Sequence, residues 1–219
     1  SAYHFLFAPP RSDLRLTGRA ASPRIAPMQA VVLNAFADSA NVKQQFAREH
    51  ADRIVQVARL IANAFNSGNK VLLFGNGGSS TDAAHIAAEF VGRYRRDRVP
   101  LPAIALATDI AAITCIANDY GYEELFARQV RAHGRKGDIA VGISTSGNSP
   151  NVLKGITAAR ECGLITVAWT GGSGGTLAGL VDYPFIVPST LTSRIQESHI
   201  TLGHVLCELI EDHLLGNAS

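Results

Sequence analysis

Two histidines, a glutamate and a glutamine stand at spacings that place them in pairs on helix faces. His85 and Glu89 are four residues apart, and Gln196 and His204 are eight apart, so the members of each pair share one face of a predicted helix. Taken singly, each pair is typical of a surface hydrogen bond or of a histidine at the core edge. Together they offer two imidazoles, a carboxylate and an amide oxygen, which suit a zinc ion or general acid and base chemistry.

Hydroxyl side chains crowd the segment Ser144–Ser149, between a predicted strand and a predicted helix. Pro150 is the expected first residue of that helix, and Ser149 is its N-cap. Exposed amides at a helix start attract anions, and hydroxyls around them would complete a phosphate site without a fixed positive charge. A polar turn with a good cap explains the same residues equally well. A Walker loop is excluded, because the Gly-Lys-Ser/Thr ending is missing.

The loop Gly75–Ser79 follows a predicted buried strand, and its glycines would let the backbone approach a ligand closely. It lacks the GxGxxG spacing, and no acidic residue ends the next strand, so a sugar or a phosphate fits it better than a dinucleotide. A simple tight turn is the alternative. Asn118 and Asp119 end another predicted helix, where they are either a turn with an Asx cap or a ligand contact.

The elements that must position these residues alternate between short apolar strands and helices. Strands are predicted at 70–74, 103–106, 139–143, 165–169 and 185–187, and a last helix at about 192–215. Such strands form a parallel sheet covered on both faces, which binds ligands at the carboxyl ends of its strands. Helical spacing from Met28 to Asn66 predicts two more helices. We therefore expect one α/β domain over residues 28–219, a three-layer sandwich around a five-stranded parallel sheet.

Composition limits the class of protein. Of the 219 residues, 47% are hydrophobic and 17% are charged, as in globular proteins. The net charge of +2 arises mainly in residues 1–27, which hold four arginines against one aspartate, so nucleic acid is not an expected partner. No stretch suits a membrane span, and three cysteines without CxxC spacing suit the cytoplasm. We expect residues 1–27 to be a non-native or disordered extension, and the arginines between 93 and 98 to be solvated.

Four motifs in order resemble the sugar isomerase (SIS) domain of phosphoheptose isomerases. They are Gly75–Ser79 with His85 and Glu89, 117–121, 142–149, and 194–200 with His204. The similarity spans about residues 28–215. It implies a flavodoxin-like fold and the conversion of sedoheptulose 7-phosphate to D-glycero-D-manno-heptose 7-phosphate through an enediol, the first step towards nucleotide-activated heptose for lipopolysaccharide and other surface glycans.

The resemblance also implies a role for each matching residue. Glu89 and His204 would exchange protons with the sugar. One zinc ion per subunit would be held by His85, Glu89, Gln196 and His204. The phosphate would be bound by Ser144, Thr145, Ser146 and Ser149, and the sugar by Asn76, Gly77, Gly78, Ser79, Glu89, Asn118, Asp119 and Gln196. Such enzymes are cytoplasmic homotetramers whose active sites are shared between subunits.

Two non-catalytic classes with this domain stay open as alternatives. One associates with the bacterial replication initiator, and its pattern lacks the carboxylate and the second histidine that stand here as Glu89 and His204. The other is a regulatory sensor that binds a phosphosugar and usually carries an attached effector domain, for which residues 1–27 are too few.

Overall fold

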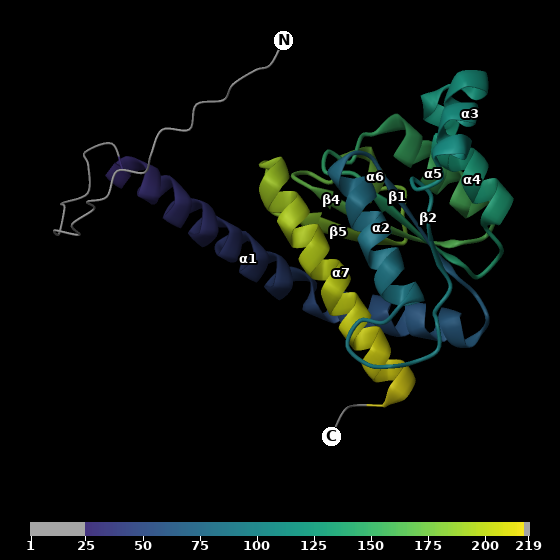
Figure 1. The fold of residues 1–219 in the computed structure, drawn as a ribbon, viewed down its shortest axis with the longest axis horizontal. Coiled ribbons are helices and arrows are strands. Elements are labelled where there is room, and N and C mark those ends of the chain that lie inside the picture. The colour runs from purple at the N-terminus through teal and green to yellow at the C-terminus, as the bar shows by residue number, and fades with distance from the viewer. Residues whose placement is uncertain (1–24, 217–219) are drawn as a thin grey trace, which may run out of the picture. The chain divides into compact units, whose positions relative to one another are not determined.

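A five-stranded parallel sheet forms the centre of the computed structural model, which describes residues 25–216 (Figure 1). Its strands are β1 (Val71–Gly75), β2 (Ala103–Ala105), β3 (Ile139–Ile143), β4 (Ile165–Gly171) and β5 (Tyr183–Val187). They lie in the order β2-β1-β3-β4-β5, and every neighbouring pair is parallel. This is the flavodoxin-like order, so the predicted sheet is confirmed.

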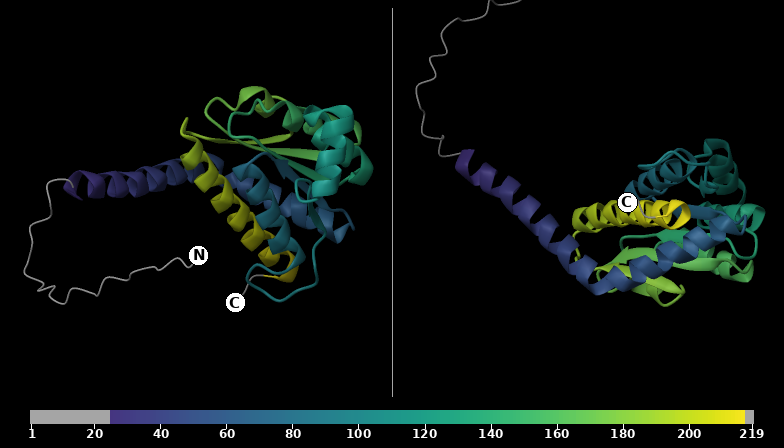
Figure 2. Two further views of the ribbon diagram at one scale, coloured as in Figure 1. Left: turned by 45° about the horizontal axis from the view of Figure 1, so that its top comes forward. Right: turned by 90° about the horizontal axis from the view of Figure 1, so that it is seen from below.

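Helices cover both faces of the sheet, as the left view of Figure 2 shows. The helices are α1 (Ile25–Asn66), α2 (Gly78–Val91), α3 (Ile110–Tyr120), α4 (Leu125–His133), α5 (Pro150–Glu161), α6 (Gly175–Ala178) and α7 (Thr192–Leu215), with a 3-10 turn at Tyr122–Glu124. One core joins the sheet to α2, α7 and the part of α1 from Phe46 onward. The other joins it to α4, α5 and α6. The expected three layers are therefore present.

Alternation along the strands produces these two cores. In β1, Val71 and Leu73 belong to one core, whereas Leu72 and Phe74 belong to the other, because successive side chains of a strand point to opposite faces. All five residues of β1 are buried. A continuous apolar run is therefore what this central strand requires.

The expectation of two helices between Met28 and Asn66 is wrong, because α1 is continuous over this stretch. No glycine or proline stands between these two residues, and alanines recur along the segment, so nothing in the sequence interrupts the helix. The helix begins at Ile25, three residues before Met28. Residues 1–24 lie outside the described part of the chain, and the domain boundary at residue 28 stays a prediction.

The outer edge of β5 is covered by side chains from α1. His50 Nε2 lies 3.2 Å from the carbonyl oxygen of Ile186, and Arg53 donates to the carbonyl oxygen of Pro184 at 2.8 Å. Pro184 has no N–H to leave unpaired, as suits an edge strand. The outward carbonyls of two alternate β5 residues are thus hydrogen-bonded within the chain. Among the described residues, no helix has both the length and the apolar character needed to cross a membrane.

Candidate active site

The sheet places two of the predicted loops at neighbouring strand ends. β1 leads through Asn76 and Gly77 into α2, and β3 leads through Ser144–Ser149 into α5. β1 and β3 are adjacent in the sheet, and the chain moves from them in opposite directions across it. This is the topological switch point at which open α/β sheets bind their ligands.

The start of α5 has the form that an anion site requires. Ser149 is its N-cap and Pro150 its first residue, as predicted. The Ser149 hydroxyl makes no capping hydrogen bond within the described structure; it lies 3.0 Å from the Ser144 hydroxyl, which is 3.5 Å from that of Ser146. The first amides of α5 therefore lack the usual side-chain acceptor, and three hydroxyls gather beside them.

A cavity of about 260 Å³ opens next to these hydroxyls. It is lined by Thr145, Ser146, Gly171, Gly172, Ser173, Ser189, Thr190, Thr192 and Ile195. Among the described residues, no charged side chain lines this cavity. The hydroxyls that follow β5 were missed by the sequence analysis, although the rule that ligands bind at strand ends applies to the fifth strand as well.

Gly147 allows the two loops beside this cavity to touch. Its φ of 66° lies in the left-handed region, and a β-carbon would overlap the carbonyl group of Gly174. The Gly147 carbonyl accepts from the amide of Leu177 at 2.9 Å. Asn148 accepts from both the amide and the hydroxyl of Thr176 at 3.0 Å. The hydroxyl-rich loop is thereby fixed to the loop that follows β4.

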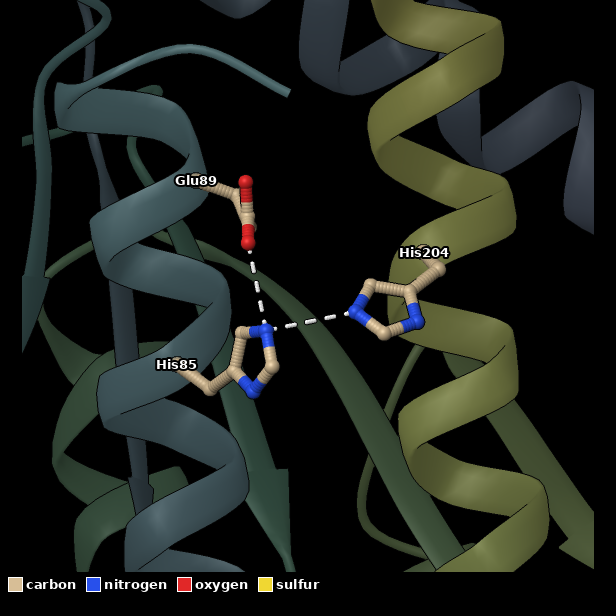
Figure 3. A group of neighbouring side chains, drawn as sticks. All are labelled: His85, Glu89 and His204. Carbon is tan, nitrogen blue, oxygen red and sulfur yellow. Dashed lines mark hydrogen bonds and ion pairs between the residues drawn. The ribbon is translucent and has the colours of Figure 1, made fainter. Parts of the chain in front are cut away.

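Figure 3 shows His85, Glu89 and His204 converging between α2 and α7. His85 Nε2 lies 3.1 Å from Glu89 Oε1 and 3.3 Å from His204 Nε2. One ligand atom from each residue lies within 4.8 Å of the others. The structure thus brings together three of the four predicted metal ligands, from helices that are far apart in the sequence.

The chemistry of this group fits a metal ion. His85 Nε2 faces both a carboxylate oxygen and another imidazole nitrogen, and a single proton on Nε2 cannot make two good hydrogen bonds in different directions. A cation would accept a lone pair from each of the three ligand atoms, which are the two imidazole nitrogens and the carboxylate oxygen. Zn–N distances of ~2.0–2.1 Å in a tetrahedral site separate neighbouring ligands by ~3.4 Å, close to the separations between His85 and its two partners.

Gln196, the fourth predicted ligand, lies against the backbone of Gly78 at the start of α2. A β-carbon on Gly78 would overlap the Gln196 amide nitrogen, so glycine at this position leaves room for the Gln196 side chain as it lies here. His204 is eight residues further along α7, or ~12 Å along the helix axis. Gln196 therefore faces the glycine loop, as a sugar contact would, and its role as a metal ligand stays a prediction.

The His204 ring is held on two sides. The Tyr94 ring stacks on it with centroids 5.6 Å apart and planes inclined by 19°. The His85 ring meets it at 67° with centroids 5.0 Å apart. The sequence analysis missed Tyr94, because its arginine neighbours indicated a solvent-exposed segment.

A buried ion pair fixes the segment that carries Tyr94. The side chains of Arg98 and Glu211 are each 2% exposed, and Arg98 Nε donates to the Glu211 carboxylate at 3.1 Å. The Arg98 guanidinium also donates to the carbonyl oxygens of Glu89 and Phe90, each at 2.8 Å. The expected solvated arginine run is therefore wrong for Arg98, which binds the end of α2 to α7.

The Glu211 carboxylate receives further hydrogen bonds from the backbone. The amides of Tyr94, Arg95 and Arg96 donate to it at 3.0–3.1 Å. Burial alone would raise the pKa of Glu211, but these hydrogen bonds and the Arg98 charge outweigh burial and lower that pKa. The carboxylate is therefore held in its charged form.

Asp82 is a further carboxyl group near the cluster, one turn before His85 on α2. Its Oδ2 is buried and has no hydrogen-bond partner among the described residues. Burial raises the pKa of Asp82, and the charge of His85 acts in the opposite direction. Its spacing of three from His85 was the signal that the sequence analysis did not use.

The remaining predicted sugar contacts lie in two places. Gly77 is the N-cap of α2 with a φ of 55°, and Ser79 is buried in its first turn. Asn118 and Asp119 lie in the last turn of α3, where the Asn118 amide donates to Asp119 at 2.7 Å. Both are exposed. Their contacts with a sugar stay predictions.

Comparison with known proteins agrees with this geometry. The family model described as the SIS domain matches residues 36–171. A phosphoheptose isomerase of Thermodesulfovibrio yellowstonii is 57% identical over 183 residues, which are 84% of this chain and 91% of that protein. One from Aquifex aeolicus is 58% identical over 177 residues, or 81% of this chain and 93% of that protein.

A solved structure extends the likeness to the fold. The phosphoheptose isomerase of Neisseria gonorrhoeae superposes with a TM-score of 0.80 at 43% identity, covering 84% of this chain and 99% of that one. Identity this high over nearly the whole length of these relatives goes beyond a shared fold. The chain belongs to the phosphoheptose isomerases of the SIS-domain family and is an isomerase of phosphosugars.

Proposed function

We propose that the protein converts sedoheptulose 7-phosphate to D-glycero-D-manno-heptose 7-phosphate in the cytoplasm, as the first step towards nucleotide-activated heptose for surface glycans. The convergence of His85, Glu89 and His204 carries this proposal, because it supplies an acid–base pair. The hydroxyl-lined cavity next to the Ser144–Ser149 loop would supply an uncharged site for the phosphate. Turnover of sedoheptulose 7-phosphate by the purified protein is the direct test. Binding of the sugar phosphate without turnover would favour the alternative, a non-catalytic SIS-domain phosphosugar-binding or replication-initiator-associating protein.

The proposed reaction needs a base at carbon and a group that moves a hydroxyl proton. Glu89 takes the proton from the carbon beside the carbonyl, and an enediol forms. His204 transfers the hydroxyl proton, because an imidazole ring can both accept and donate a proton. Glu89 then returns its proton to the neighbouring carbon. Glu89 is free to act as a base only when it is not coordinated, so we propose that substrate binding releases it.

We also propose one zinc ion per subunit, held by His85, Glu89, Gln196 and His204. The ion would supply polarisation of the sugar oxygens. The two imidazoles and the carboxylate are already within 4.8 Å of one another, which supports a preformed site.

Protein purified without chelator should contain about one zinc per chain by elemental analysis. His204→Ala should weaken zinc binding by at least ~10–100-fold. Removing a residue that only hydrogen-bonds to a metal ligand already costs this much affinity. His213→Ala is the matched control, because it removes another histidine of α7 outside the cluster. Equal zinc content in wild type and His204→Ala would contradict the assignment.

Phosphate recognition should depend on hydroxyls and helix amides rather than on charge. Ser146→Ala should raise the Michaelis constant for the sugar phosphate by ~10–100-fold, since a hydrogen bond to a charged group contributes ~1.5–3 kcal/mol. Steady-state kinetics measures this, with Ser67→Ala at the end of α1 as the control. An unchanged Michaelis constant would remove this loop from the site.

We propose that the protein is a homotetramer with shared active sites. Helix α3 is apolar, yet none of its eleven residues, all within the described chain, is buried. Ile110 in that helix is 76% exposed. Exposed apolar faces of this kind mark subunit interfaces.

Multi-angle light scattering at micromolar concentration should therefore give a mass near four times 23.2 kDa. Ile110→Glu places a charge on the exposed face of α3 and should shift the population towards smaller species, because burying an unpaired charge is costly. A wild-type mass of a single chain would contradict the proposal.

A further inference from the structure

The side chain of Asn76, in the loop after β1, is held by two residues from other elements. Asn76 Nδ2 donates to Asn151 Oδ1 at 2.8 Å, and Asn151 Nδ2 donates back to Asn76 Oδ1 at 2.9 Å. The Tyr122 hydroxyl donates to the same Asn76 Oδ1 at 2.9 Å. Asn76 thus makes three hydrogen bonds through its side chain.

These bonds leave Asn76 with one unused position. An amide oxygen accepts through two lone pairs, and an amide nitrogen donates two hydrogens. Asn151 and Tyr122 occupy both lone pairs of Asn76 Oδ1, and Asn151 occupies one hydrogen of Nδ2. The second Nδ2 hydrogen remains, so in this arrangement Asn76 can recognise an acceptor and cannot recognise a donor.

The amide is also fixed in orientation. Asn151 is 2% exposed and lies in the first turn of α5, directly after the loop that holds the predicted phosphate ligands. Turning the Asn76 amide would break a reciprocal pair of buried hydrogen bonds, each costly to leave unmade. The direction of the free N–H is therefore tied to α5, the helix whose start is the predicted phosphate site.

The proposed isomerisation has a use for such a donor. As Glu89 takes the proton, the electron pair of the C–H bond becomes a carbon–carbon double bond and the carbonyl π pair moves onto oxygen. That oxygen gains negative charge in the transition state, so a fixed donor binds it more strongly there than in the ground state.

We propose that Asn151 and Tyr122 are positioning residues that orient Asn76 so that its free N–H donates to the sugar oxygen that becomes negatively charged. Because Glu89 of the same chain lies eleven residues beyond Gly78 on α2, or ~16 Å along the helix axis, the Glu89 that acts on this sugar would come from a second copy of the chain in the proposed shared site. This inference rests on the proposed function. In this proposal Asn151 and Tyr122 act only through Asn76. Their effect on catalysis should therefore disappear when Asn76 is replaced, whereas an effect on folding would not.

A double-mutant cycle tests the proposal with sedoheptulose 7-phosphate. Asn76→Ala and Asn151→Ala should each lower kcat by ~10²-fold, the effect of losing or misplacing one such donor, with KM changed less than about threefold. Since both remove the same interaction, the double variant should lose no more than about threefold beyond the worse single variant. A merely structural role for Asn151 would make the two losses multiply to ~10⁴-fold, which would overturn the proposal.

Tyr122→Phe provides a second cycle if Asn151→Ala does not fold, because Tyr122 is exposed and the change removes only its hydroxyl. We expect kcat to fall ~2–10-fold, the value of one hydrogen bond, and no further fall when Asn76 is already alanine. A rise in KM with unchanged kcat in an active enzyme would contradict the inference. A wild-type protein without isomerase activity would instead refute the proposed function, a result that the wild-type assay alone reveals.

Discussion

Glu89→Gln should lower the turnover of sedoheptulose 7-phosphate by ~10²–10⁴-fold, the usual contribution of general acid–base catalysis. Glutamine keeps the size of the side chain and removes the group that accepts the proton. Because the predicted phosphate and sugar contacts other than Glu89 are unchanged in this variant, KM should change little. Steady-state kinetics on the variant measures both constants.

Two controls separate lost chemistry from lost structure. Glu161→Gln alters an exposed carboxylate that pairs with Arg131 on the opposite side of the sheet from α2, and it should keep wild-type turnover. Thermal unfolding of Glu89→Gln should match wild type, since Glu89 is only partly buried. If Glu89→Gln retains more than about a tenth of wild-type turnover, the base is another residue.

Glu211→Gln should lower the free energy of unfolding by about 3–5 kcal/mol, the cost of breaking a buried ion pair from one side. The change leaves the Arg98 guanidinium buried without its counter-charge. It also weakens the acceptor for three backbone amides that fix the segment from Tyr94 to Arg96. Urea unfolding monitored by circular dichroism measures the loss.

The effect of this carboxylate depends on pH in a defined direction. The pKa of Glu211 is lowered in the folded protein, so its contribution is fully present above the unfolded glutamate pKa of ~4.3 and is lost as pH falls through the lower folded pKa. The stability difference between wild type and Glu211→Gln should therefore be constant near neutral pH and shrink below about pH 4.

Glu161→Gln is again the matched control, because Glu161 and Arg131 are both more than half exposed. Exposed pairs contribute ~0–1 kcal/mol, so this variant should unfold almost as wild type does. A Glu211→Gln variant as stable as Glu161→Gln would show that the Arg98–Glu211 pair does not hold the two helices together.

The sheet was predictable because its signals are local. Each strand is a short apolar run followed by turn residues, and the predicted and observed bounds of β3 agree at Ile139–Ile143. The last helix also has the predicted bounds, Thr192–Leu215. The N-cap at Ser149 and the first residue Pro150 follow from the residue types that helix starts favour.

The features that were missed depend on contacts between distant residues. Nothing in the sequence near Arg98 shows that a carboxylate 113 positions later faces it. The sequence analysis therefore predicted a solvent-exposed arginine where the structure has a buried one. The Asn76–Asn151 pair spans 75 positions and has no spacing rule. The break expected within α1 was wrong for a different reason, because a gap in apolar periodicity does not end a helix that lacks glycine and proline.

The covered edge of β5 determines how copies of this chain can meet. An open strand edge accepts a strand from another molecule, which is the route to edge-to-edge aggregation and amyloid-like growth. Here His50 and Arg53 already occupy the outward carbonyls of Ile186 and Pro184, and the strand at the other edge, β2, has only three residues. The sheet is therefore a poor template for extension at both ends, which leaves helical faces as the surfaces for the proposed association of copies without polymerisation.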